Sequence, residues 1–146
     1  MEIPDHDHAQ LKELCAEGDV LVEMGDFAAA YENYMAAMKL VPEPKEQFQA
    51  MTWILAALGN LYFRTQDYKQ AAQVFSDAMH CVDAIGNPFL HLRLGQVQLE
   101  LGNGGRAADE LCRAYMGAGK QLFEKEDPKY FEFLKSRIHP PANGAW

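Results

Sequence analysis

The 146-residue sequence lacks any uninterrupted apolar run of the roughly 20 residues that would cross a bilayer. Its first ten residues, MEIPDHDHAQ, also lack the basic region and apolar run of a secretory signal. We therefore expect a cytoplasmic protein that neither enters nor binds a membrane. The apolar fraction of 49% and charged fraction of 23% are typical of a soluble globular protein, and the length suits a single domain.

Cysteine is scarce, and its placement excludes a disulfide framework. Cys15, Cys81 and Cys112 are far apart, form no CxxC motif and are odd in number. Each lies in an apolar helical pattern, where a free cysteine behaves as a small buried hydrophobic residue. We therefore expect three free thiols.

Sequence patterns for catalysis and for cofactors are also missing. No Ser/His/Asp set, carboxylate pair or zinc-ligand spacing stands out, so we expect neither an enzyme nor a cofactor. His6 and His8 alternate with Asp5 and Asp7, a pattern that could hold a metal ion. Because no further ligand set accompanies them in the sequence, we interpret this segment as a mobile polar terminus.

Positive charge is almost absent from the N-terminal quarter. Residues 1–34 contain nine acidic residues and only Lys12 as a base, whereas the remaining residues contain 12 of each sign. The net charge of −8 therefore arises entirely at one end. Such an end repels nucleic acid and could attract a basic protein, although a simply solvated surface is the alternative interpretation. The 13 basic residues do not cluster with aromatic residues, which also argues against nucleic-acid binding.

Three stretches of the sequence share one internal spacing. In each, a glycine is followed by an alanine after 12 residues, a bulky residue after 4 more, and another alanine after 3 more. The members are Gly18, Ala30, Tyr34 and Ala37; Gly59, Ala71, Phe75 and Ala78; and Gly95, Ala107, Leu111 and Ala114. Polar breaks at Gly25-Asp26, Gln66-Asp67 and Gly102-Asn103 separate two helical segments in every unit. A fixed spacing that recurs three times is typical of a repeat architecture.

Packing explains why these residue types recur. Glycine costs about 1 kcal/mol relative to alanine inside a helix, so its presence indicates a close approach of a second helix. The first alanine of each unit allows the same approach from the opposite side. We expect the bulky residues Tyr34, Phe75 and Leu111 to fill the space towards the next unit.

The pattern resembles the tetratricopeptide repeat (TPR), a helix–turn–helix unit of 34 residues. The resemblance implies an all-α, right-handed solenoid of about seven helices, with repeats at about residues 11–44, 52–85 and 88–121. Gln98 and Gly104 replace the aromatic residues expected in the third repeat. Asp127 and Pro128 indicate the start of a capping helix over about 128–138. The domain then extends over 9–138, between an acidic flexible tail at 1–8 and a C-terminal tail at 139–146.

In TPR arrays the first helix of each repeat lines a concave groove that binds another protein. By this resemblance, the groove residues are Asp19, Glu23, Trp53, Asn60, Phe63, Arg64, Phe89, Arg93, Gln96 and Glu100. Aromatic residues and arginine often dominate binding energy, although Trp53 and Phe89 could instead pack under neighbouring helices. TPR domains that bind a C-terminal carboxylate would need basic or amide side chains at Cys15, Asp19, Ala57, Phe89 and Arg93. Only Arg93 fits, so that function is disfavoured.

Two binding functions and a third, catalytic one remain open. The segments at 87–103 and 106–135 are similar to small bacterial TPR proteins of polymorphic toxin systems, which implies an immunity protein that binds a basic toxin domain. Type III secretion chaperones, which hold an extended peptide, are similar in size, acidity and three-repeat layout. An enzyme or metal protein on a helical scaffold is supported only by the segment at Asp5–His8.

Overall fold

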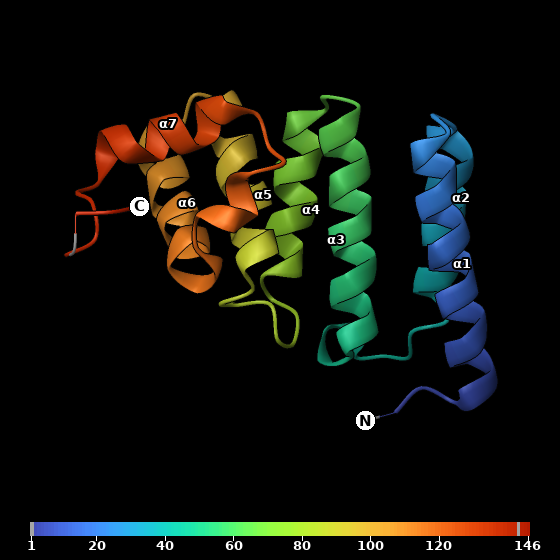
Figure 1. Cartoon of the computed structure of the whole chain (residues 1–146). Helices are drawn as coiled ribbons and strands as arrows, with labels where there is room; N and C mark the ends of the chain where they lie inside the picture. The colour runs from blue at the N-terminus through green and yellow to red at the C-terminus, as the bar shows by residue number, and fades with distance from the viewer. Residues whose placement is uncertain (1, 143) are drawn as a thin grey trace. The chain divides into compact units, whose positions relative to one another are not determined.

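The computed structural model describes residues 2–142 and 144–146 and is entirely helical over that range (Figure 1). It contains seven α-helices and two short 3-10 helices there, and no strand. In chain order these are α1 (Asp5–Glu23), α2 (Phe27–Lys39), η1 (Lys45–Gln47), α3 (Gln49–Arg64), α4 (Tyr68–Ala78), α5 (Pro88–Glu100), α6 (Gly104–Ala118), η2 (Lys120–Phe123) and α7 (Pro128–Arg137). The predicted all-α TPR-type fold is confirmed. In the described part of the chain no helix has both the length and the apolar character needed to cross a membrane.

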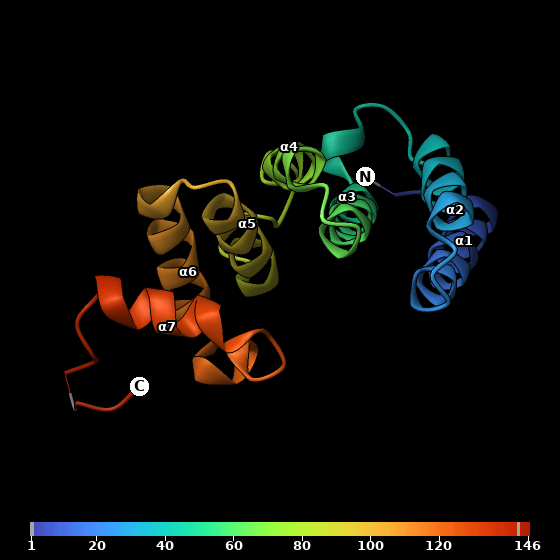
Figure 2. The same ribbon diagram turned by 90° about the horizontal axis from the view of Figure 1, so that it is seen from above.

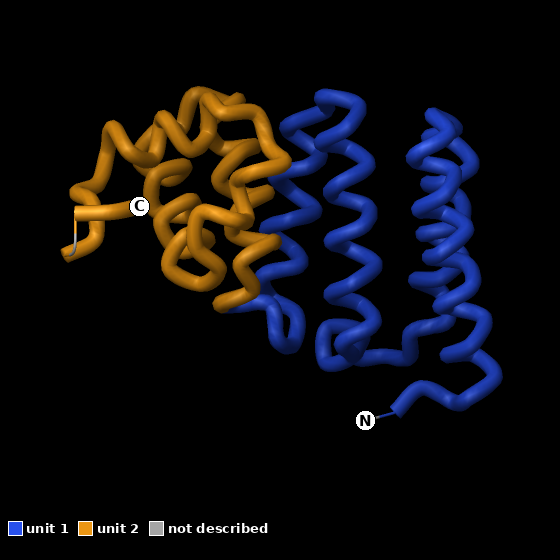
Figure 3. Tube along the Cα trace, in the orientation of Figure 1, with its two compact units in different colours: residues 1–85 blue, residues 86–146 orange. Residues whose placement is uncertain are grey.

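The chain forms two compact units, which we describe separately (Figure 3). Unit 1 ends at Ile85 and contains two helical hairpins, α1/α2 and α3/α4. Unit 2 begins at Gly86 and contains the hairpin α5/α6 followed by η2 and α7. Within each hairpin the two helices lie side by side (Figures 1 and 2).

The turns between paired helices use the residues that the sequence pattern singled out. Gly25 and Gly102 have positive φ values of 81° and 85°, which glycine adopts without strain. Asp26 and Asp67 then cap the second helix of their hairpins, because each carboxylate accepts a hydrogen bond from the backbone N–H three residues later. Asn87 caps α5 in the same way, through the N–H groups of the next turn.

The spaced glycines carry the closest helix contacts. A Cβ atom at Gly18 would lie 2.7 Å from a ring carbon of Tyr34, and one at Gly59 would lie 2.6 Å from a ring carbon of Phe75. A Cβ at Gly95 would meet Leu111 at 2.7 Å. Each glycine therefore makes room for the bulky residue of its own hairpin, 16 positions later. We expected the bulky residues to fill space towards the next unit; each contacts the glycine of its own hairpin, and Leu111 also packs with Phe123 and Leu134 of the segment that follows.

The ends of unit 1 differ from the expected boundaries. Helix α1 begins at Asp5, so residues 5–8 are helical, and Asp5 and Asp7 in its first turn complement the positive end of the helix dipole. Helix α3 begins at Gln49, before the expected start of the second repeat at about residue 52, and the connection from α2 contains the short helix η1. Backbone and side-chain hydrogen bonds tie this connection and α3 to Val82, whose N–H donates to Glu46 and whose carbonyl accepts from Thr52.

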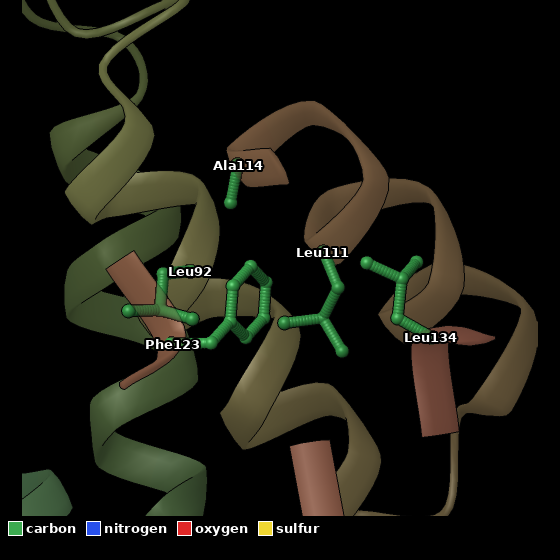
Figure 4. Packing of buried hydrophobic residues seen from close by; sticks show 5 residues of the cluster. All are labelled: Leu92, Leu111, Ala114, Phe123 and Leu134. Atoms are coloured by element: carbon green, nitrogen blue, oxygen red, sulfur yellow. The ribbon is translucent and has the colours of Figure 1, made fainter. Parts of the chain in front are cut away.

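Unit 2 is sealed by its C-terminal segment. Phe123 of η2 and Leu134 of α7 pack with residues of α5 and α6 into one buried cluster, completed by Leu92, Leu111 and Ala114 (Figure 4). The rings of Tyr115 and Phe131 are stacked with centroids 6.0 Å apart, and the ring of Trp146 meets both edge-on. A terminal cover of this kind buries the apolar face that the last repeat would otherwise expose.

Candidate functional site

The first helices of the two hairpins in unit 1 are joined by an ion pair. Arg64, at the end of α3, donates to the Glu23 carboxylate, at the end of α1, over 3.0 Å. The two side chains are 41% and 74% exposed, so the pair contributes little stability. This pair places two of the expected groove residues on one accessible edge of unit 1.

Asp19, one turn before Glu23, is held in position by a hydrogen bond from α2. The hydroxyl of Tyr34 donates to the Asp19 carboxylate over 2.6 Å, while the tyrosine ring is buried against Gly18. Burial and the hydrogen bond to Asp19 raise the pKa of Tyr34 well above its ordinary value. Asp19 itself remains exposed, so its carboxylate is held in position and still faces solvent.

The aromatic residues of α3 differ in exposure. Trp53 is 47% exposed, so it is not packed under a neighbouring helix, which was the alternative that the sequence left open. Phe63 is half-buried and meets the ring of Tyr68 edge-on with centroids 5.9 Å apart. Asn60 is also half-buried. Trp53 is therefore the most accessible of these three side chains.

The expected groove residues of unit 2 are largely occupied by contacts within that unit. Arg93 donates to Gln96 over 2.7 Å and forms an ion pair with Glu126, and Gln96 donates to the same Glu126 oxygen over 2.8 Å. Gln96 is fully buried, and the side chains of Arg93 and Glu126 are 14% and 17% exposed. The guanidinium of Arg93 also lies over the ring of Phe89, which is 37% exposed.

Glu100 is engaged by α7. Its carboxylate pairs with Lys129 over 2.5 Å and accepts a hydrogen bond from the Tyr130 hydroxyl over 2.8 Å. Burial acts to raise the pKa of Glu100, but the hydrogen bonds from Lys129 and Tyr130 outweigh it, and the pKa lies below its ordinary value. Residues 126–130 thus cover the face of α5 that the TPR resemblance assigned to a binding groove.

A buried polar pair in unit 2 was not identified from the sequence. His91 and Glu110 are joined by a 2.6 Å contact between Nδ1 and the carboxylate, with side chains only 6% and 14% exposed. The Gly86 N–H donates to His91 Nε2, so Nδ1 carries the proton and donates to Glu110. The available signal was a lone histidine between Leu90 and Leu92 in an apolar run, but it does not reveal the partner.

The two units differ in net charge. Unit 1 has 14 acidic and five basic residues, whereas unit 2 has seven acidic and eight basic residues. On α1 alone, Glu13, Glu17, Asp19 and Glu23 are all exposed. The negative potential of the chain is therefore concentrated on the surface of unit 1.

The histidines near the N-terminus do not assemble into a metal site in the described residues. His6 is exposed and His8 is half-buried on α1. Over residues 2–142 and 144–146 no group of three or more His, Cys, Asp or Glu side chains is arranged to hold an ion.

Comparison with known proteins adds one match. Residues 14–44 match the family model of the tetratricopeptide repeat, and no curated protein matches the sequence. The matched residues include the C-terminal half of α1 and all of α2, and the Gly18–Tyr34 contact lies among them. TPR units generally mediate protein–protein interaction. Residues 14–44 therefore match a tetratricopeptide repeat in sequence, and the two later hairpins repeat the glycine contact of the first.

Proposed function

We propose that this chain is a non-catalytic protein that binds a basic partner protein through the α1–α3 surface of unit 1. The observation that carries the proposal is the contrast between the two sets of expected groove residues. In unit 2, Arg93, Gln96 and Glu100 are satisfied by residues 126–130. In unit 1, Asp19, Glu23 and Trp53 are exposed.

Electrostatics supports a basic partner. Unit 1 has nine more acidic than basic residues, and the acids of α1 are exposed. A surface of one sign raises the rate of encounter with an oppositely charged protein, and this effect weakens as salt is added. Aromatic side chains at the centre of such a surface supply the short-range binding energy that charge alone does not.

Among proteins of this kind, we favour an immunity protein that neutralises a toxin domain by direct binding. Its support is the small size, the acidic α1 and the similarity of residues 87–103 and 106–135 to TPR proteins of toxin systems. Neutralisation by binding requires no catalytic group in the binder. A secretion chaperone that holds an extended peptide is the alternative, because an open surface with a half-exposed tryptophan also suits an unfolded segment.

The first experiment is capture of the partner by the full chain, followed by association kinetics with the purified protein at about 0.05 M and about 0.5 M salt. The test variant is Asp19→Asn with Glu23→Gln, which removes two charges and leaves an acceptor for the Tyr34 hydroxyl. The matched control is Glu32→Gln with Glu43→Gln, which removes two exposed charges outside α1 and α3.

We expect the test variant to associate severalfold more slowly than the wild type at low salt and the control to associate at nearly the wild-type rate. Equal rates for both variants would contradict the assignment of the surface. Co-expression with the captured protein separates the two roles. An immunity protein restores growth and binds the folded toxin domain, whereas a chaperone binds the unfolded segment and restores no growth.

A further inference from the structure

A cavity of about 330 Å³ lies in unit 1 where the N-terminal segment meets the start of α3. The residues that matter for its chemistry are Glu2, Ile3, Asp5, His8, Phe48 and Trp53. They come from two segments that are 40 positions apart in the sequence at their nearest residues, His8 and Phe48. The volume lies at the lower end of the range for pockets that bind small ligands or single side chains. We call this cavity the Trp53 pocket.

The Trp53 pocket combines aromatic and acidic groups. The Trp53 indole is 47% exposed, and Phe48 is buried with 7% exposure. Glu2 and Asp5 are exposed, and among the described residues neither carboxylate forms an ion pair with a lysine, arginine or histidine. An accessible indole beside two carboxylates that pair with no cation of residues 2–142 or 144–146 provides both components of a site for a positively charged group.

We propose that the Trp53 pocket receives an arginine or lysine side chain of the partner protein. The cationic group would lie over the indole face and contact the carboxylates of Glu2 and Asp5. Arginine fits better than lysine, because a planar guanidinium stacks on an aromatic ring and donates two parallel hydrogen bonds to a carboxylate. This inference rests on the proposed binding of a basic protein and specifies one contact of that interface.

The N-termini of two helices in the lining oppose the binding of a cation, but their combined positive charge is smaller than the negative charge of the two carboxylates. The N-termini of α1 and α3 lie at the pocket, and each contributes a partial positive charge of roughly half an elementary charge. Two carboxylates outweigh this sum.

The experiment is a titration of the full chain with acetyl-Gly-Arg-Gly-amide, followed by the indole N–H resonances in a ¹H–¹⁵N spectrum. The chain has two tryptophans, so Trp53→Phe assigns the signals, and Trp146 in unit 2 serves as an internal control. The matched ligand is the same peptide with citrulline, which has nearly the same shape and no charge.

We expect the arginine peptide to shift the Trp53 resonance saturably, while the citrulline peptide and the Trp146 resonance show little change. Glu2→Gln with Asp5→Asn should weaken the apparent affinity about threefold or more. Glu32→Gln with Glu43→Gln removes the same charge outside the pocket and outside α1 and α3, and should leave the affinity unchanged. Equal shifts with both peptides, or unchanged affinity in the pocket variant, would overturn the inference.

The two proposals fail in different ways. If the peptide does not shift Trp53 but the captured protein still binds with the expected charge dependence, only the pocket assignment is wrong. If the arginine peptide binds the pocket but the full chain captures no protein, the pocket stands as a site for a cationic side chain and the proposed protein-binding function is wrong.

Discussion

Replacing Gly59 by alanine should destabilise the protein, although the same change in an ordinary helix is stabilising. The new Cβ atom would lie 2.6, 2.7 and 2.8 Å from three ring carbons of Phe75. Normal contacts between carbon atoms are about 3.5–4.0 Å, so the ring must move by about 1 Å. Because Phe75 is fully buried, its ring can move only against the side chains packed around it.

The magnitude follows from two opposing terms. Alanine is favoured over glycine by about 1 kcal/mol in a helix interior, whereas overpacking a filled core costs about 1–3 kcal/mol. Three close ring atoms place the Gly59 site near the upper end of that range. We therefore expect a net loss of about 1–2 kcal/mol and, for a chain of this length, a Tm lower by about 2–8 °C.

Thermal unfolding followed by far-UV circular dichroism measures this change. Gly105→Ala in α6 is the control, because a Cβ atom there meets nothing within 4 Å. We expect the control to leave the Tm unchanged or to raise it. Phe75→Leu provides a second test, since leucine lacks the two nearest ring atoms, Cε1 and Cζ. In that background Gly59→Ala should lose most of its cost.

Two results would refute this reasoning. The first is a Tm for Gly59→Ala that rises as much as that of the Gly105 control. The second is a cost for Gly59→Ala that stays the same with phenylalanine or leucine at position 75, because contact with the ring would then not be its cause.

Three further predictions concern polar groups. Tyr34→Phe should lower the free energy of unfolding by about 1 kcal/mol at neutral pH. Because the folded-state pKa of Tyr34 is raised by burial and by Asp19, the wild type should lose stability above about pH 10. Urea unfolding at several pH values should show this loss reduced in Tyr34→Phe, and an identical decline in both proteins would contradict it. Burial raises the pKa of Cys15 to about 11, so iodoacetamide should modify this thiol at about pH 8 more slowly than it modifies free cysteine. Peptide mass spectrometry measures the rate, and a rate equal to that of free cysteine would be inconsistent with the burial of Cys15. Glu126→Ala should cost about 2–4 kcal/mol in chemical unfolding, because it removes the carboxylate that forms an ion pair with the largely buried Arg93; a loss below about 0.5 kcal/mol would show that the pair is not structural.

The helical hairpins could be predicted from the sequence because their signals are local. The step from Gly18 to Ala30 and Tyr34 recurs with the same lengths, and close packing at a glycine requires that spacing. Asp26 and Asp67 cap helices through backbone groups three residues away, so their function can be inferred from a short window.

The candidate site was less predictable, because it depends on pairs of residues distant in the sequence. The TPR pattern places Arg93 and Gln96 on the groove side of α5 but contains no information about Glu126, some 30 positions later. The Trp53 pocket likewise depends on where the N-terminal segment runs, and the sequence alone suggested a flexible tail there.

The neighbours that the bulky residues contact were also hard to predict from the sequence. Helical spacing shows that Tyr34 faces inward but not which neighbour it meets. In the structure the Tyr34 ring, on α2, packs against Gly18 of α1. Its hydroxyl donates to Asp19, which is also on α1. One residue therefore serves both the core and the surface of unit 1.

The contacts between α5 and residues 126–130 have a consequence for how such a protein can diverge. Because Arg93, Gln96 and Glu126 satisfy one another, a change at one of them requires a compensating change at another. The exposed positions of α1 and α3 are less restrained, because the Arg64–Glu23 pair between these helices is exposed and contributes little stability. Relatives adapted to different partners should therefore differ mainly on these two helices, while the three polar residues of unit 2 are exchanged together or not at all.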